Sequence, residues 1–284
     1  MMNHSQWLAA MIVEQVLLGK NLDKSFKLVL TKYNNEAENL PQIKDMTYGA
    51  IRDLGKSKFY INKLVKNKIE NLCLESLLHI VLFQINHSRS NDFTLVNQAV
   101  DAAKKIDRKK SSFINAVLRN FLRNKDSLEK ELKEDESAVY SYPKWWIEKV
   151  KNQYPENWQD ILNVGNQRPP LALRINLQKL KIKEYSNTLD EEGIENTLVS
   201  DECLIVKKPL DVNKIPGFLD GKVSVQDLGA QLAAHIIELK NDQRVLDACS
   251  APGGKACHML ELKKIRLTAI ESDKQRTIKI IDNI

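Results

Sequence analysis

The chain has 284 residues, 43% of them hydrophobic and 28% charged, and its formal net charge is +6. This composition is that of a soluble globular protein, and the length is enough for two or three domains that each bury a core. A net positive charge permits a polyanionic partner but does not require one.

The cysteines and the apolar segments exclude several classes of protein. The four cysteines are scattered, without a C-x-x-C pair, which argues against a zinc site and a disulfide framework and suits a reducing compartment. Gln6, Glu14 and Gln15 interrupt the apolar residues of the N-terminus, unlike the core of a signal peptide. The longest apolar run, Leu77–Ile85, is too short to span a bilayer. We therefore expect a cytoplasmic monomer with no bound metal and no membrane partner.

Residues 1–135 predict an all-helical domain, a bundle of six or seven helices, because apolar residues recur there at three- and four-residue spacing. Gly19 suits the end of the first helix. Beyond Pro41 the apolar residues follow one long helical pattern as far as Val65. The segment Leu72–Ile85 is apolar nearly all round, which is typical of a central, buried helix.

Two stretches of this helical domain are strongly basic. Residues 52–68 hold six Lys and Arg side chains against one acid, and residues 104–110 form a basic loop between helices. Each lysine taken alone is most simply a solvated surface group. Taken together, the two stretches predict a face for RNA phosphates, whose binding would weaken as salt rises. The candidate RNA-binding residues here are Arg52, Lys56, Lys58, Lys109, Lys110, Arg119 and Arg123.

Residues 136–222 predict linker helices followed by a small α/β subdomain. Just before them, residues 125–136 alternate Lys with Asp and Glu and predict a charged linker helix. Trp145, Trp146 and Trp158 lie on two short predicted helices that follow. Stacking on bases is one possible use of these tryptophans, but packing between the helices is favoured.

A β-α-β-β unit is predicted between residues 169 and 222. Its first strand alternates so that Leu171, Leu173 and Ile175 face inward and Arg174 lies on the outer face. Gly193 suits a left-handed cap at the end of the helix that follows. An outward Arg174 could contact RNA, although the unit could also be a spacer beside the next domain.

The C-terminal region has the pattern of a nucleotide-like site. A short apolar strand at 245–249 breaks at 252–254, an amphipathic helix runs through Glu261, and a second strand at 267–270 ends at Glu271. Glycines let the backbone approach the charged end of a ligand, and a terminal acid accepts hydrogen bonds from ribose hydroxyls.

Three ligands compete for this turn. A phosphate-binding P-loop would need Gly at position 249 and Ser or Thr at position 256, which hold Cys249 and Ala256. A dinucleotide fingerprint, G-x-G-x-x-G, is absent from the turn. S-adenosyl-L-methionine remains, because two adjacent glycines can meet its amino-acid end. The alternative to a ligand is an ordinary turn between a strand and a helix.

Longer motifs resemble a known family. The run DACSAPGGK at 247–255 looks like the cofactor-binding motif of the RNA cytosine-C5 methyltransferases, and residues 221–234 (GKVSVQDLGAQLAA) resemble that family's approach to it. FINAVLRNFLR at 113–123 and NQRPPLALRIN at 166–176 are similar to the bacterial 16S ribosomal RNA enzymes of the RsmB (Sun/Fmu) group. The resemblance covers nearly the whole chain.

The resemblance implies a multidomain fold: a NusB-like helical RNA-binding domain over 1–135, linker helices and a small α/β RNA-binding subdomain over 136–222, and the incomplete start of a Rossmann-like methyltransferase domain over 223–284. It implies S-adenosyl-L-methionine as cofactor, ribosomal RNA as partner and methylation of cytosine C5 in small-subunit ribosomal RNA. The matching cofactor residues are Cys249, Ser250, Ala251, Pro252, Gly253, Gly254, Lys255 and Glu271.

The chemistry of this family needs cysteines that lie elsewhere. A thiolate adds to C6 of cytosine so that C5 can take the methyl group. By resemblance, the nucleophile belongs to a Thr-Cys motif and a second cysteine to an Asp-Ala-Pro-Cys motif, both beyond Ile284, whereas Cys249 and Cys257 are not nucleophiles. We therefore expect a truncated, inactive chain that binds cofactor weakly, with a non-catalytic RNA-binding module or pseudoenzyme as the alternative.

Overall fold

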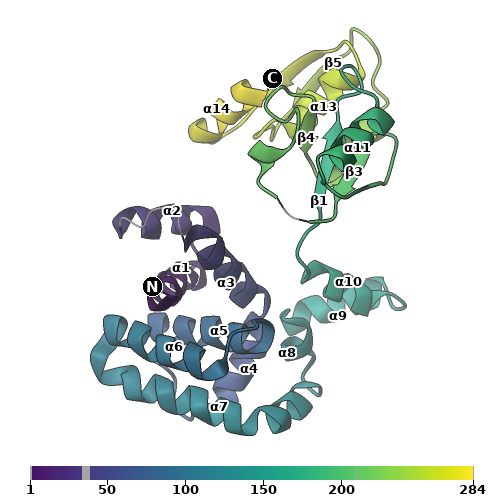
Figure 1. Ribbon diagram of the computed structural model, residues 1–284. Coiled ribbons are helices and arrows are strands. Elements are labelled where there is room, and N and C mark those ends of the chain that lie inside the picture. The colour runs from purple at the N-terminus through teal and green to yellow at the C-terminus, as the bar shows by residue number, and fades with distance from the viewer. Residues whose placement is uncertain (1, 34–38, 209, 284) are drawn as a thin grey trace. The chain divides into compact units, whose positions relative to one another are not determined.

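The computed structural model describes residues 2–33, 39–208 and 210–283. It divides into two compact units, Met1–Gln167 and Arg168–Ile284 (Figure 1). The predicted finer boundaries after residues 135 and 222 stay a prediction. In the described part of the chain, no helix is both long and apolar enough to cross a membrane.

The first unit opens with a helical bundle arranged around one buried helix. That helix, α5 (Leu72–His87), packs against α1 (Met2–Leu17), α3 (Leu40–Arg52), α4 (Leu54–Leu64), α6 (Asp92–Asp107) and α7 (Ser111–Leu132). Leu77, Leu78 and Val81 on it are fully buried, which confirms the prediction of a central helix. The bundle also contains α2 (Leu22–Lys32) and the 3₁₀ turn η2 (Arg108–Lys110).

Two helix boundaries differ from the sequence prediction. The long pattern beyond Pro41 is two helices, α3 and α4, which separate at Asp53. After this break Gly55 brings α4 close to α8 (Glu136–Tyr140), since a Cβ on Gly55 would lie 2.4 Å from the Ser137 carbonyl oxygen. Residues 125–132 are helical, as predicted, but their predicted role as a linker is wrong: they continue α7, which buries Leu128 and Leu132 in the core of the bundle.

The rest of the first unit is a small helical cluster formed by α8, α9 (Lys144–Gln153) and α10 (Trp158–Gly165). Trp158 lies edge-on to Tyr140, with ring centroids 5.2 Å apart, as packing between helices predicts. Trp145 and Trp146 differ, since 63% and 38% of their surfaces are exposed. The packing interpretation therefore holds for Trp158 and is wrong for Trp145.

The second unit contains a four-stranded antiparallel sheet in the order β2-β3-β1-β4. Its elements are β1 (Leu171–Ile175), α11 (Ile182–Glu191), β2 (Asn196–Leu198), β3 (Cys203–Val206), the 3₁₀ turn η3 (Val212–Lys214) and β4 (Val223–Val225). One face of the sheet packs on α11 through Leu173, Leu204 and Leu189. Gly193 follows α11 with φ +72°, the left-handed conformation that the sequence predicts.

A pair of parallel strands follows the antiparallel sheet. The elements are α12 (Leu228–Ile236), β5 (Arg244–Asp247), α13 (Gly254–Leu262), β6 (Arg266–Ala269) and α14 (Lys274–Asn283). Helices α12 and α13 pack against each other, and α12 also contacts β1. Ala172 and Arg174 of β1 are buried, so the second face of the antiparallel sheet is covered as well.

Candidate cofactor site and nucleic-acid interface

The cofactor turn, residues 248–253, connects β5 to α13. Gly253 has φ +107°, a conformation that a residue with a Cβ rarely adopts, and its N–H donates to the Ser250 carbonyl at 2.6 Å. The Ala251–Pro252 peptide bond is cis. Helix α13 begins at Gly254, and the first N–H groups of a helix lack intrahelical acceptors. The turn thus places a helix N-terminus, which favours negative charge, at the carboxyl end of β5.

Glu271, the acid at the end of β6, lies beside this turn with only 6% of its side chain exposed. Its Oε1 accepts from the Asp273 N–H at 3.0 Å, and its Oε2 accepts from the Ala251 N–H at 3.3 Å. The Asp273 N–H bond, followed by the charge of Arg276, holds the pKa of Glu271 below its ordinary value. Glu271 is therefore a charged side chain that ties the turn to β6.

Helix α14 closes over the other side of the turn. Arg276 donates from Nη2 to the Ala251 carbonyl at 2.7 Å, and Asn283 donates from Nδ2 to the Pro252 carbonyl at 2.8 Å. The Cys257 thiol on α13 lies 3.1 Å from the Asn283 carbonyl. Three carbonyl oxygens are thus satisfied by contacts between the turn, α13 and α14.

Two polar groups near the turn have no hydrogen-bond partner among the described residues. They are Oγ of Ser250 and Oδ2 of Asp247, both shielded from solvent. Buried polar atoms are usually paired, so unpaired ones beside a helix N-terminus indicate room for a polar ligand. Sequence reasoning assigned Ser250 to the site and overlooked Asp247, whose place at the carboxyl end of a parallel strand was the available signal.

The predicted cofactor residues therefore divide by exposure. Ser250, Ala251, Gly253 and Glu271 are gathered around the inside of the turn. Cys249, Pro252 and Lys255 are exposed, and Gly254 is partly exposed at the start of α13.

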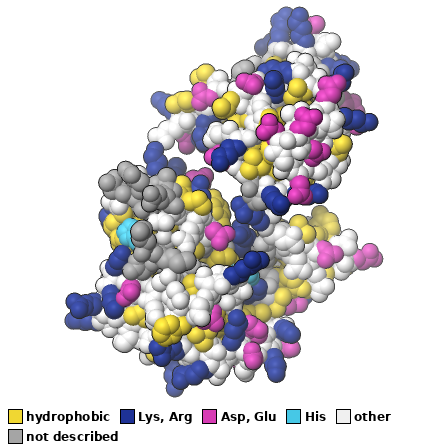
Figure 2. All heavy atoms as spheres, in the orientation of Figure 1, with side chains coloured by type: hydrophobic (Ala, Val, Ile, Leu, Met, Phe, Trp, Pro, Cys, Tyr) yellow, Lys and Arg dark blue, Asp and Glu magenta, His cyan; other side chains and the backbone are white. Residues whose placement is uncertain are grey.

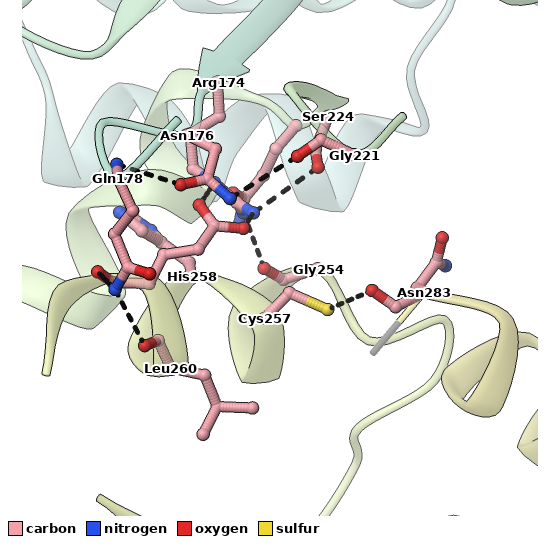
Figure 3. Close-up of polar contacts among 12 residues, drawn as sticks. Arg174, Asn176, Gln178, Gly221, Ser224, Gly254, Cys257, His258, Leu260 and Asn283 are labelled. Carbon is pink, nitrogen blue, oxygen red and sulfur yellow. Dashed lines mark hydrogen bonds and ion pairs between the residues drawn. The ribbon is translucent and has the colours of Figure 1, made fainter. Parts of the chain in front are cut away.

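Arg174 lies on the face of β1 opposite the core with α11, as the alternation predicts, but the prediction that this face is open to RNA is wrong. Only 1% of it is exposed. It binds Glu261 on α13 through Nη2 to Oε1 at 2.6 Å and Nε to Oε2 at 3.1 Å, and its Nη1 donates to the Gly254 carbonyl at 2.7 Å (Figure 3). The same nitrogen donates to Gln226 Oε1. Because α13 covers this face of β1, Arg174 is unavailable to RNA and instead links the sheet to the helix that begins at the cofactor turn.

The remaining basic candidates lie on the first unit, where Figure 2 shows lysine and arginine side chains spread over the visible face, with acidic side chains among them. Lys110 of η2 lines a hollow together with Lys66 and Lys68, which precede α5. This hollow brings together the two basic stretches, which are separated by about forty residues in the sequence. Lys109 is exposed beside it.

The other basic candidates occupy different places. Lys58 lines a hollow between α4 and the segment around α8, and Lys56 Nζ lies 3.9 Å from Asp53 Oδ1. Arg119 and Arg123 line a third hollow on α7, next to the exposed ring of Phe93. Arg52 is partly buried at the end of α3. The predicted residues therefore form several basic surfaces rather than one.

Comparison with known proteins matches three successive regions of the chain. Residues 3–123 match the NusB family, residues 142–213 match the ferredoxin-like domain of RsmF/B-like methyltransferases, and residues 234–284 match the 16S rRNA methyltransferase RsmB/F family. The fold and the turn thus define a chain that joins a NusB-type helical domain and a ferredoxin-like domain to a C-terminal methyltransferase region.

Similar proteins extend this match over the whole chain. The probable ribosomal RNA small subunit methyltransferase B of Coxiella burnetii is 32% identical over 95% of this chain and 64% of its own length. The ribosomal RNA small subunit methyltransferase B of Pseudomonas syringae is 33% identical over 97% of this chain and 63% of its own length. The crystal structure of PH0851 has the same fold, with a TM-score of 0.70 at 22% identity over 98% of this chain and 66% of that one. The chain belongs to the RsmB family, and it spans slightly less than two thirds of the length of these two relatives.

Proposed function

We propose that this chain supplies the RNA-recognition domains and part of the S-adenosyl-L-methionine site of an enzyme that methylates cytosine C5 in small-subunit ribosomal RNA. The names of the similar proteins support ribosomal RNA as the substrate class. The observation that carries the cofactor assignment is the turn itself, in which Gly253 opens a helix N-terminus beside the unpaired oxygens of Asp247 and Ser250. A ribosomal RNA partner would place this activity in the cytoplasm.

The residues around the turn fit such a cofactor. The N–H groups at the start of α13 would bind the carboxylate of its amino-acid end, because a helix N-terminus favours negative charge. Oε1 of Glu271 accepts from the Asp273 N–H and the Ser272 hydroxyl, whereas Oε2 accepts only the Ala251 N–H, which leaves a lone pair on Oε2 for a ribose hydroxyl. When bound, S-adenosyl-L-methionine supplies an electrophilic methyl group. Gly253 and Glu271 would hold and orient it.

The cysteines support a non-catalytic role for these 284 residues by themselves. A nucleophilic cysteine needs a thiolate, which a lowered pKa provides. Burial instead raises the pKa of Cys257 and Cys203, and it raises that of Cys73 to about 12. Cys249 is exposed within the cofactor turn, so burial does not argue against it, and only the family resemblance assigns it to cofactor binding and not to catalysis. We therefore infer that the chain by itself binds RNA without transferring a methyl group.

The proposed phosphate-binding surface is the hollow lined by Lys66, Lys68 and Lys110, together with the neighbouring Lys109. Two acids, Glu70 and Asp107, also line the hollow, so the lysines outnumber them by four to two. Each phosphate contact that a lysine makes releases a counterion, so it steepens the salt dependence of binding by about 0.7–0.9 units of slope. The double substitution Lys109→Gln and Lys110→Gln should therefore flatten the slope of log K against log salt by about 1.4–1.8.

Fluorescence anisotropy with fragments of small-subunit ribosomal RNA measures this slope. The matched control replaces two exposed lysines of α2, Lys24→Gln and Lys27→Gln, and removes the same net charge. If the control flattens the slope as much as the substitutions at 109 and 110, the surface assignment fails. If the wild-type chain transfers labelled methyl groups to cytosine, the non-catalytic role fails.

A further inference from the structure

Two histidines and a glutamate meet where the antiparallel sheet, α12 and α13 come together in the second unit. Glu202 precedes β3, His235 lies in the last turn of α12, and His258 lies in the middle of α13. Nε2 of His235 is 2.5 Å from Glu202 Oε1, and Nε2 of His258 is 3.1 Å from the same oxygen. One potential ligand atom from each residue lies within 4.8 Å of the other two. None of these residues belongs to the cofactor turn or to the basic surfaces.

We propose that Glu202, His235 and His258 form a binding site for a divalent transition-metal ion of the zinc type. Two imidazole nitrogens and one carboxylate oxygen are a donor set that Zn²⁺ uses in sites with an open fourth position. Tetrahedral bonds of about 2.0–2.1 Å keep ligand atoms roughly 3.3 Å apart, so the two imidazole nitrogens need to move less than about 1 Å away from the Glu202 oxygen to admit an ion.

Burial and charge favour a cation at this position. Glu202 and His258 are 7% and 1% exposed, so a carboxylate charge lies in a place with little water. A buried carboxylate is costly unless it is paired, and the nearby guanidinium of Arg174 is already paired with Glu261. A divalent ion would balance the charge of Glu202 while using both imidazoles as neutral ligands.

The surroundings also set the character of the site. His235 is half exposed, so it leaves a path for the ion and room for a water molecule as fourth ligand. Nδ1 of His258 is buried without a partner among the described residues, whereas metal-binding histidines usually donate that N–H to an acceptor. The lack of this support should weaken binding by about 10–100-fold relative to a fully supported site. The ion would fasten α12 and α13, and thus the start of the cofactor helix, to the sheet.

The test uses the 284-residue chain after treatment with a chelator. Isothermal titration with Zn²⁺ should give one site per chain, and Co²⁺ should give the visible absorption of a tetrahedral ion bound to nitrogen and oxygen. His235→Ala, at the exposed ligand, should weaken Zn²⁺ binding at least about 100-fold, since loss of a ligand exceeds loss of its outer support. His235→Cys keeps a ligand and should restore binding, with a thiolate-to-cobalt band.

His87→Ala is the matched control. His87 is also about half exposed, and its Nε2 also lies 2.5 Å from a carboxylate oxygen, that of Asp53 in the first unit. This variant should bind Zn²⁺ like the wild type. Equal affinity of the wild type and His235→Ala, or a thiolate band already present in wild-type Co²⁺ spectra, would overturn the proposal and leave a carboxylate that bridges two imidazoles.

Discussion

Replacing Arg174 by Met should destabilise the second unit far more than the loss of an ordinary surface charge. The guanidinium is buried and makes two charge-assisted hydrogen bonds to Glu261, on α13. It also satisfies the Gly254 carbonyl, so one side chain joins β1 to both the start and the last turns of α13. Methionine fills much of the same volume but satisfies none of these groups.

The magnitude follows from what the substitution leaves behind. The Glu261 side chain is only 17% exposed, so it would remain as a charge with little access to water. Removing one partner of a buried ion pair costs about 3–5 kcal/mol for this reason. Arg174→Lys should cost less, because it keeps the charge and loses the two-pronged geometry. The double variant Arg174→Met with Glu261→Leu should recover most of the loss, since no buried charge remains.

The stability of each unit can be measured separately in the intact chain. All four tryptophans, Trp7, Trp145, Trp146 and Trp158, lie in the first unit, so their emission reports on that unit alone. Amide hydrogen exchange of β1 and α13 reports on the second unit. We expect Arg174→Met to lower the free energy of opening of both segments together and to leave the tryptophan-detected midpoint unchanged.

A matched control is Lys181→Met, which breaks a pair in which Lys181 and Glu184 are 83% and 67% exposed. Such exposed pairs contribute about 0–1 kcal/mol. If Arg174→Met lowers the free energy of opening of β1 and α13 no more than this control does, the buried network does not hold α13 to the sheet, and our reasoning is wrong.

Two further predictions concern pH and cofactor binding. Burial, with a smaller effect of Lys58, lowers the pKa of His79 to about 4, so between about pH 6.5 and pH 4 the unfolded chain binds a proton that the folded chain excludes. The stability of the first unit should therefore fall by up to about 3 kcal/mol as pH drops through this window, and tryptophan-detected urea unfolding of His79→Gln should show a weaker pH dependence. Asp247→Asn should weaken S-adenosyl-L-methionine binding at least about tenfold in equilibrium dialysis, because a buried charged acceptor is lost. The control Asp242→Asn, in the exposed loop before β5, should leave S-adenosyl-L-methionine binding unchanged. An equal loss of affinity in both variants would contradict the assignment of Asp247 to the site.

Local patterns were sufficient to predict much of the fold. The segment Leu72–Ile85 is apolar on all sides, and only a helix surrounded by others can bury it. Gly193 marks the end of α11 because its φ of +72° favours glycine. These features depend on neighbours in the chain, so the sequence contains the information needed to predict them.

Features that depend on distant residues were missed. The edge strand β4 has three residues, too few to show a period of two, and it is defined by pairing with β1 some fifty residues earlier. The break at Asp53 was missed because the apolar spacing of α3 continues into α4 without a proline. The second helix takes its own direction through packing against α5, α7 and α8, which lie later in the chain.

Arg174 shows the limit of reading a strand by alternation. A period of two separates the side chains of β1 into two faces, but it does not say whether the polar face meets water or a second layer. The answer lies 80 and 87 residues later, at Gly254 and Glu261, which make the buried position favourable for an arginine. The same holds for the proposed metal site, whose two histidines lie 33 and 56 residues from Glu202 and match no ligand spacing within one element. A charged residue on an alternating strand therefore predicts a solvated face only where no later element carries the groups that would pair with it.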